Sequence, residues 1–418
     1  MLRLSLPTPF RVRSFRLQCP ADLLTSCAFE METLILGWYV LAETGSVVLL
    51  TVFAALQYGG TLVAPMVGVV GDRIGHRNLL CGMRAIYTTL ASTLMLLAFA
   101  GALKPALVLL IGGMIGMVRP SDLGMRLALI AAHMPREQLT PAMGISRTTS
   151  DTARVAAPLA GATAFAAFGF APAYVLVAGC YAAGLLMTLA IAPRPAGAEV
   201  QRASTPVPVR PSAWSDLKEG VAYAWSTPEL LAALLIAFLV NMTAYPLTNG
   251  LLPYVAKDVY SIDQTGLGYL VASFGIGSLI GSLLMSLKGS RMRPARMMLN
   301  SAIAWYAMLL LFAQMSSPWA GMAMLMLAGI GQSICMVTVA VVLLRATSEH
   351  LRGRIMGVRM MVIYSLPLGL LAAGALIQHV GFHLTATLYA AAGLLFTVLI
   401  GLRWHAVVWS PETPANAR

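Results

Sequence analysis

Long apolar runs separated by short polar segments make up most of this sequence. Each run approaches or exceeds the roughly 20 residues that a helix needs to cross the hydrocarbon core of a bilayer. Helices are expected rather than barrel strands, because the runs are continuous and do not alternate between apolar and polar residues. A helix also satisfies its own backbone hydrogen bonds in lipid. Twelve runs can be delimited, at residues 17–42, 47–70, 79–101, 105–133, 140–168, 171–192, 229–252, 264–287, 297–315, 318–345, 353–378 and 382–404.

A polar break rich in proline divides the twelve runs into six and six. Residues 193–228 contain most of the local charge and the prolines Pro193, Pro195, Pro206, Pro208 and Pro211. We therefore predict an all-α membrane protein with two pseudo-symmetric six-helix bundles around a central cavity. The N-terminal bundle is expected at residues 1–192, a cytoplasmic linker at 193–228, and the C-terminal bundle with a short cytoplasmic tail at 229–418.

Two loops in equivalent places of the halves resemble each other. The segment from Glu137 to Arg147, between the fourth and fifth runs, recurs from Glu349 to Arg359, between the tenth and eleventh. The three matching positions are all 212 residues apart. Parallel six-helix repeats of this kind are typical of one large class of membrane transporters.

Composition agrees with a membrane protein. Of 418 residues, 58% are hydrophobic and only 11% are charged, whereas soluble domains carry about 25% charged residues. The formal net charge of +12 does not indicate nucleic-acid binding, because the basic residues sit in short clusters between the runs. With the N-terminus in the cytoplasm, 26 of the 28 lysines and arginines fall on the cytoplasmic side. The positive-inside rule therefore places both termini in the cytoplasm, and we expect a multi-pass protein of a bacterial inner membrane.

The start of the chain and the metal-binding residue types predict no further site. Residues 1–16 are basic but lack an apolar core followed by a cleavage site, so we interpret them as a cytoplasmic leader. The five cysteines are scattered without a CxxC pair, as expected for core residues. Copper binding by the 25 methionines is a weaker alternative to flexible packing, since no His or Cys joins them at ligand spacing. We expect no metal and no cofactor. The chain also lacks a Gly-x4-Gly-Lys-Ser/Thr loop, so ATP hydrolysis is not expected.

A loop rich in glycine and charge follows the second run, and it reads Gly68-Val-Val-Gly-Asp-Arg-Ile-Gly-His-Arg77. It resembles the signature loop of the major facilitator superfamily, Gly-x3-Asp-Arg-x-Gly-x-Arg-Arg, and departs from it at His76 and Asn78. In that family the loop latches the two halves in the outward-facing state. The first glycine would permit close helix packing, and the later one a sharp turn. The implied latch residues are Gly68, Asp72, Arg73, Gly75 and Arg77, with partners Arg352, Arg354 and Arg359 at the start of the eleventh run.

Three further stretches resemble the drug-exporter-like branch of that superfamily, which includes siderophore and macrolide exporters. They are residues 37–40 (GWYV), 135–139 (PREQL) and 350–357 (HLRGRIMG). Residues 154–161 resemble a degraded Gly-Pro antiporter motif, with Ala157 in place of the glycine before Pro158. The resemblance implies a secondary active transporter, not an enzyme. It would export an amphipathic drug, siderophore or metabolite in exchange for protons, and we expect it to be a monomer in membrane lipid.

Ionisable residues inside the runs are functional candidates, because a charge in the membrane is energetically costly. Glu30 and Glu32 in the first run are two residues apart and so face different ways on a helix. Glu30 shares a small, polar stripe with Ser26, Thr33 and Gly37, whereas Glu32 lies in a more apolar setting. We predict that Glu30, or alternatively Glu32, takes up and releases a proton. The other interpretation is a structural carboxylate bonded to a neighbouring helix.

The fourth and fifth runs each carry a charged stripe. The two helices should be antiparallel, so residues whose numbers sum to 273 should lie level. If the two stripes face each other, they form a six-member ion network. In one interpretation Asp122 or Asp151 exchanges a proton while Arg119 meets an anionic group. In the other the stripes form a gate or a structural staple, with Arg126 and Arg147 nearest the cytoplasm. The six residues of the two stripes are Arg119, Asp122, Arg126, Arg147, Asp151 and Arg154.

The second half has almost no charge inside its runs, so we expect it to supply an adaptable, mostly apolar wall of the substrate cavity. Pro246 and Pro367 are expected to bend its helices. Two other functions remain open. One is uptake of a small anion or metabolite, and the other is a lipid-moving or sensor protein of the same fold. The candidate cavity residues are Arg119, Arg154, Asn241, Tyr245, Phe238, Trp305 and Tyr364.

Overall fold

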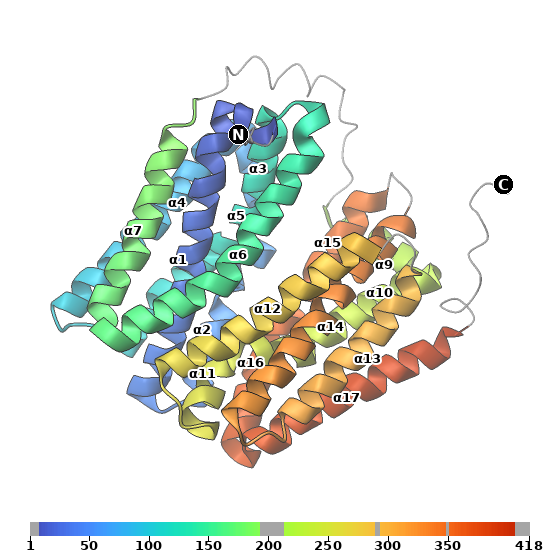
Figure 1. Ribbon diagram of the computed structural model, residues 1–418. Coiled ribbons are helices and arrows are strands. Elements are labelled where there is room, and N and C mark those ends of the chain that lie inside the picture. Colours follow the sequence, from blue (N-terminus) through green and yellow to red (C-terminus); the bar gives the residue numbers. More distant parts are fainter. Residues whose placement is uncertain (1–7, 193–212, 289–292, 348–350, 406–418) are drawn as a thin grey trace, which may run out of the picture. The chain divides into compact units, whose positions relative to one another are not determined.

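The computed structural model describes residues 8–192, 213–288, 293–347 and 351–405. Within these ranges the protein is helical and has no strand (Figure 1). By contacts the chain divides into two units. The first unit comprises Met1–Pro208 and Leu252–Ala272, and the second comprises Val209–Leu251 and Ser273–Arg418.

The first unit contains the six N-terminal membrane spans. Its helix α1 packs against α5, α6 and α7, while α4 packs against α5 and α7. The second span is broken into α2 and α3 by a 3₁₀ turn at Gly59–Leu62. The helices are α1 (Arg13–Thr44), α2 (Val47–Leu56), α3 (Ala64–Ile74), α4 (His76–Phe99), α5 (Pro105–His133), α6 (Arg136–Phe168) and α7 (Phe170–Leu189).

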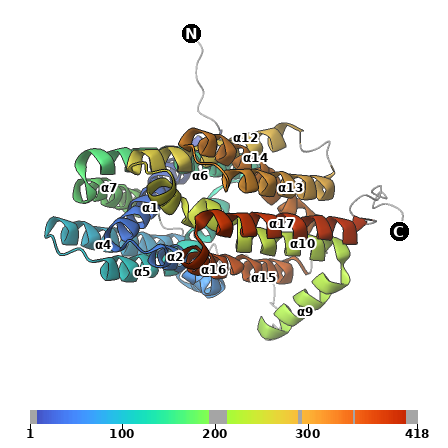
Figure 2. The ribbon, with the colours of Figure 1, turned by 90° about the horizontal axis from the view of Figure 1, so that it is seen from below.

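The second unit begins with α9, which joins α10 at an angle and lies beside α15 (Figure 2). Its helices are α9 (Ala213–Ser226), α10 (Pro228–Leu239), most of α12 (Gln264–Lys288), α13 (Pro294–Phe312), α14 (Pro318–Arg345), α15 (Arg352–Ile363), α16 (Ser365–Val380) and α17 (Phe382–Arg403). The seventh span continues beyond α10 through π-helical turns at Val240–Ala244 and Pro246–Gly250, and then through α11 (Leu252–Tyr254) and a further π-helical turn at Val255–Val259.

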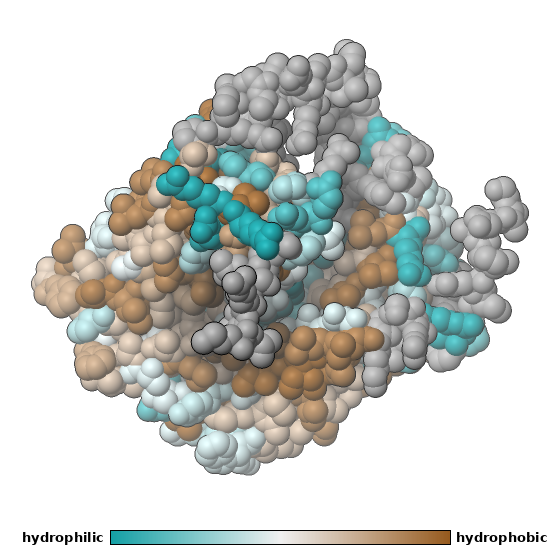
Figure 3. Space-filling view, turned by 45° about the horizontal axis from the view of Figure 1, so that its top comes forward, coloured by the Kyte–Doolittle hydropathy of each residue, from teal (hydrophilic) through white to brown (hydrophobic). Residues whose placement is uncertain are grey.

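The expected all-α membrane architecture is confirmed. Nine helical segments in the described ranges are long and apolar enough to cross a membrane. Helices α1 and α6 have 32 and 33 residues but carry ionisable side chains, and Val47–Thr61 is a shorter apolar segment. Large apolar side chains such as Leu96, Leu186 and Leu287 are more than 60% exposed, and brown apolar residues cover broad areas of the face in Figure 3. Lipid, not water, suits such a surface.

Prolines and glycines mark where the helices begin and end. Pro105, Pro228, Pro294 and Pro318 are the first residues of their helices, where the missing N–H of proline leaves no hydrogen bond unmade. Helix α1 ends at Gly45, whose φ of 62° is a left-handed conformation that favours glycine.

The eleventh span breaks between α15 and α16. In an unbroken helix the backbone N–H of residue 367 would donate to the carbonyl oxygen of Ile363, the residue at which α15 ends. Because proline has no N–H to donate, the break expected near this residue follows.

The division into units differs from a simple cut in the linker, because residues 252–272 group with the first unit. Lys257 Nζ donates to the carbonyl oxygen of Leu41, 3.2 Å away, near the C-terminal end of α1. A Cβ at Gly37 would lie 3.4 Å from Pro253 Cγ. The expected boundaries at 1–192, 193–228 and 229–418 stay a prediction.

Helix α5 approaches the broken second span so closely that only glycine fits. A Cβ at Gly116 would lie 2.1 Å from the carbonyl oxygen of Leu56, and a Cβ at Gly60 would lie 1.9 Å from that of Met117. Two backbones can therefore meet here, as small residues allow in membrane bundles.

Gly116→Ala is expected to destabilise the protein by about 1–3 kcal/mol, because the backbones must move apart. The matched control is Gly82→Ala in α4, where a Cβ would meet no atom within 4 Å. Thermal unfolding of the purified protein in detergent measures both. Equal unfolding temperatures for the two variants would contradict the close approach.

Candidate functional site

Four charged residues of the first unit form a cluster sealed from solvent, which we call the buried ion cluster: Asp22, Arg84, Asp122 and Arg126. Their exposed fractions are 3%, 0%, 2% and 4%. Two carboxylates face two guanidinium groups, so the formal charges cancel. This balance is expected, because burying an unpaired charge is very costly.

Arg84 of α4 reaches across to α1 and α7. It pairs with Asp22 of α1 and donates to the hydroxyl of Thr188 of α7. It also donates to the carbonyl oxygen of Gly184 at 3.3 Å. The Arg84 guanidinium therefore links α4 to both α1 and α7.

Arg126 of α5 completes the cluster from the other side. It pairs with Asp122 one turn earlier, and its Nε lies 3.8 Å from Asp22 Oδ1. Its Nη1 donates to the carbonyl oxygen of Asp22 at 3.1 Å and to Ser26 Oγ at 2.7 Å. Residues from α1, α4 and α5 therefore share one electrostatic unit.

Asp22 and Arg84 were missed by the sequence reasoning, although a signal for both was present. Each lies within a predicted apolar run, at 17–42 and 79–101. The criterion that selected Glu30, that an ionisable residue inside a span is a functional candidate, selects these two equally.

Glu32 is buried, with an exposed fraction of 3%. The hydroxyls of Tyr174 and Tyr181 of α7 donate to its two oxygens at 2.8 and 2.7 Å. Among the described residues no basic side chain makes an ion pair with it. Glu32 is therefore a buried carboxylate stabilised by neutral donors. The tyrosines were not predicted, because no local pattern links α1 to residues more than 140 positions away.

Glu30 is in a more open place. Its side chain is 25% exposed, and its Oε1 lies 4.0 Å from Arg154 Nε of α6. Glu30 and Glu32 face different surroundings, as their spacing predicted. The side chain of Glu30 is partly exposed, whereas Glu32 is buried.

Arg119 of α5 contacts neutral groups. Its Nη1 donates to Thr33 Oγ1 at 2.8 Å and to Gln57 Oε1 at 3.2 Å. Its Cζ lies 4.8 Å from the centroid of the Phe29 ring, a cation–π geometry. In the part of the chain that the structure describes, no carboxylate makes an ion pair with this half-buried cation.

The predicted six-member ion network between the fourth and fifth spans is wrong. Arg126 pairs with Asp122 on its own helix, and Arg147 pairs with Asp151 on its own helix at 3.2 Å. The reason is helix rotation. The α5 stripe points into the core toward α1, whereas the side chain of Arg147 on α6 is 64% exposed.

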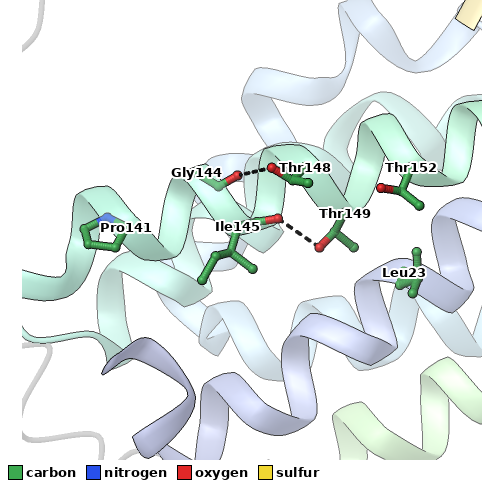
Figure 4. Close-up of a pocket in the computed structure, with 7 residues that line it drawn as sticks. All are labelled: Leu23, Pro141, Gly144, Ile145, Thr148, Thr149 and Thr152. Carbon is green, nitrogen blue, oxygen red and sulfur yellow. Dashed lines mark hydrogen bonds between the residues drawn. The ribbon is translucent and has the colours of Figure 1, made fainter. Parts of the chain in front are cut away.

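A pocket of about 450 Å³ lies between α1 and α6 in the first unit (Figure 4). Its polar side chains are threonines, which carry no charge. The hydroxyls of Thr148 and Thr149 donate to backbone carbonyls of their own helix. Their oxygens can therefore accept from a ligand. None of the predicted cavity residues lines this pocket, which is formed by Leu23, Pro141, Gly144, Ile145, Thr148, Thr149 and Thr152.

The candidate residues of the second unit have different surroundings. Phe238 is 46% exposed, whereas Trp305 is fully buried and packs edge-on against Tyr245, with ring centroids 5.2 Å apart. Asn241 is buried and donates to the carbonyl oxygen of Ala237 on its own helix. Tyr364 is half-buried at the end of α15.

A chain of neutral hydrogen bonds lies in this unit, where a mostly apolar wall was expected. Ser278 donates to Gln332 Oε1 at 3.1 Å, and Gln332 Nε2 donates to Tyr245 Oη at 2.8 Å. Tyr245 is one of the predicted cavity residues, whereas Ser278 and Gln332 were present in the sequence but were not predicted. The seventh span near Tyr245 is π-helical, a feature frequent at functional sites.

The signature loop is described in part. Gly75 has a φ of 87°, which confirms the sharp turn between α3 and α4, and Arg77 donates to the carbonyl oxygen of Leu189 at 2.6 Å. A Cβ at Gly68 would meet no atom of the described residues within 4 Å, so its expected role in close helix packing stays a prediction. Arg73 is exposed.

The predicted latch partners lie in the second unit. Arg354 of α15 pairs there with Glu219 of α9, a partner the sequence did not suggest. Arg359 is half-buried. The side chains of Asp72 and Arg352 are outside the described part of the structure, so the latch stays a prediction.

The sequence is similar to a family model and to known efflux proteins of bacteria. Residues 23–364 and 234–417 match the model of the Major Facilitator Superfamily. Macrolide efflux protein A of Streptococcus pyogenes is 24% identical over 271 residues, so the match spans 64% of either chain. Multidrug efflux pump Tap of Mycolicibacterium fortuitum is 22% identical over 369 residues, 87% of this chain and 88% of that one.

Solved transporters share the fold. The POT family transporter PepTSo superimposes with a TM-score of 0.73 at 12% identity, covering 96% of this chain and 99% of that one. The nucleoside transporter NupG gives 0.66 at 15% identity, covering 95% and 100%. With a family match over most of its length and a twelve-span helical fold, this chain belongs to the major facilitator superfamily and is a multi-pass membrane transporter rather than an enzyme.

Proposed function

We propose that this protein exports amphipathic small molecules across the bacterial inner membrane in exchange for protons, by alternating access. One observation carries the proposal. Glu32 is a buried carboxylate that accepts hydrogen bonds from Tyr174 and Tyr181, and no counter-ion from the described residues contacts it. Such a group is readily neutralised by a proton, because the protein interior disfavours isolated charge. The efflux relatives favour outward transport.

Protonation of Glu32 removes one negative charge from α1. When the two transport conformations stabilise that charge to different extents, protonation shifts the equilibrium between them. Glu30, which is partly exposed beside Arg154, would exchange protons with solvent. Asp122 and Asp151, the other candidates for coupling, both have arginine partners one turn away. We assign Asp122 to holding α5 against α1, with Arg126, and Asp151 to a gate with Arg147.

The substrate would meet mainly neutral groups. The threonine oxygens of the first-unit pocket suit an amphipathic molecule with a few polar atoms. Both termini would lie in the cytoplasm, and the protein would act as a monomer.

Everted vesicles from a bacterium lacking its own exporters test this function. Radiolabelled erythromycin, chosen because macrolide efflux proteins are among the relatives, is expected to accumulate inside the vesicles only while a proton gradient is present. Nigericin, which dissipates the pH gradient, should abolish the accumulation. Concentrative accumulation that persists after nigericin would refute proton exchange, and absence of accumulation for a wider drug panel would refute export of that class.

A second function has a specific observation in its favour. Arg119 has neutral partners at Thr33 and Gln57, so its guanidinium could receive an anionic group of a substrate taken up by the cell. Accumulation of labelled organic anions in right-side-out vesicles, lost in Arg119→Gln, would favour uptake over export.

A further inference from the structure

Phe29 of α1 lies at the centre of the charged part of the first unit. It is 7% exposed. The guanidinium carbons of Arg119 and Arg126 lie 4.8 and 5.8 Å from its ring centroid. Tyr87 of α4 and Tyr181 of α7 meet the ring edge-on, with centroids 5.0 and 5.5 Å away. Residues of three other helices therefore converge on this one ring.

The ring contacts members of two sites with different chemistry. Arg126 belongs to the buried ion cluster, where every charge has a partner. Tyr181 donates to Glu32. Arg119 donates to Thr33, the residue that follows Glu32, yet within the described ranges it forms no ion pair with Glu32, because its guanidinium is held by Thr33, Gln57 and the Phe29 ring.

This arrangement has a chemical consequence. An arginine in direct contact with a buried carboxylate stabilises the ionised form strongly. A carboxylate locked in such a pair cannot pick up a proton near neutral pH. A guanidinium held at a short distance by neutral groups lowers the cost of ionisation only in part, so both protonation states stay accessible.

We infer that Phe29 is a positioning residue that holds Arg119 away from Glu32 and so keeps the buried carboxylate able to take up and release a proton. The inference rests on the proposed proton exchange. The ring attracts the guanidinium through its electron-rich face and occupies part of the space between the helices. Titratable and charged groups of five helices surround Phe29 and Glu32. They are Tyr87 of α4, the α5 residues Arg119, Asp122 and Arg126, and Tyr174 and Tyr181 of α7. On α1 itself, Glu30 lies beside Arg154 of α6.

Infrared spectroscopy of the purified full-length protein in lipid tests the inference without any substrate. The C=O band of a protonated carboxylic acid is followed against pH, and the part lost in Glu32→Gln is assigned to Glu32. In Phe29→Leu, Arg119 loses its cation–π contact and keeps only the hydrogen bonds to Thr33 and Gln57, so we expect its guanidinium to approach Glu32 more closely. The pH at which the Glu32 band is half-lost is then expected to fall by about one unit, a tenfold change in proton concentration.

Three further variants make the test specific. Phe29→Tyr keeps the ring and should keep the wild-type midpoint. Phe15→Leu removes a ring of the same helix that is also buried, at 2% exposed, and should leave the midpoint unchanged. The double variant Phe29→Leu with Arg119→Gln should not show the downward shift, because the cation that causes it is gone.

The inference is overturned if Phe29→Leu titrates like the wild type, if the downward shift persists in the double variant, or if no band depends on Glu32. Where Phe29→Leu does not fold, Phe29→Met replaces it with the same expected shift. The proposed function has a separate test. It is refuted if the wild-type protein still accumulates drug after nigericin treatment, even when the Glu32 band titrates as expected.

Discussion

Glu32→Gln is expected to abolish proton-driven accumulation of erythromycin while the protein remains folded in the membrane. Glutamine keeps the size of the side chain and still accepts from Tyr181 or Tyr174, but it cannot alternate between charged and neutral forms. Accumulation should fall about tenfold or more. If protonation of Glu32 changes the free-energy difference between the two conformations by ~1.4 kcal/mol, their population ratio already changes tenfold, and glutamine removes this effect.

Vesicle transport measures this change, and the same helix supplies a control. Glu43 lies on α1 but is exposed, so Glu43→Gln should accumulate drug like the wild type. Glu30→Gln should lie between the two, since Glu30 is reached by solvent beside Arg154. If Glu32→Gln still accumulates drug at the wild-type rate and in response to the gradient, Glu32 is not the proton carrier.

Arg84→Met is expected to cause the largest loss of stability among single substitutions in the first unit. It removes the partner of Asp22 and leaves a carboxylate that is 3% exposed next to Arg126 alone. Breaking a buried ion pair from one side costs about 3–5 kcal/mol. For a unit of this size the thermal midpoint should fall by on the order of 10 °C.

Thermal unfolding of the purified protein in detergent measures the loss of stability in Arg84→Met. Two further variants show whether the buried ion pair is its cause. Arg147→Met removes a pair whose arginine is 64% exposed and should change stability by less than about 1 kcal/mol. Adding Asp22→Leu to Arg84→Met should recover part of the loss, because no uncompensated charge remains at that position. Equal midpoints for Arg84→Met and Arg147→Met would show that the cluster contributes no more than a surface pair.

Most of the fold could be predicted from the sequence because the membrane imposes a local rule. A span must be apolar for about 20 residues wherever it lies in the chain, so each run can be recognised without knowing its neighbours. The break of the second span at Gly59–Leu62 was not predicted. It depends on how closely α5 approaches, and that approach joins residues about 60 positions apart, such as Leu56 and Gly116.

The candidate site was predicted less well, and particular residues show why. Spacing on one helix correctly separated Glu30 from Glu32, because residues two apart face different ways. The pairing of α5 with α6 was wrong, since spacing within each helix does not reveal how the two helices are rotated toward α1. Asp22 and Arg84 carried the same signal as Glu30 and were overlooked.

By itself the sequence determined the helical class, the number of spans, the signature loop and the presence of costly charges inside the membrane. Those properties depend on composition and on spacing along one helix. Only the tertiary structure decided which partner each charge has: two tyrosines of α7 for Glu32, an arginine of α4 for Asp22, and a phenylalanine ring for Arg119. The physical reason is that a side chain's electrostatic surroundings are set by helices that are distant in sequence, and their rotation and depth follow from the packing of the whole unit.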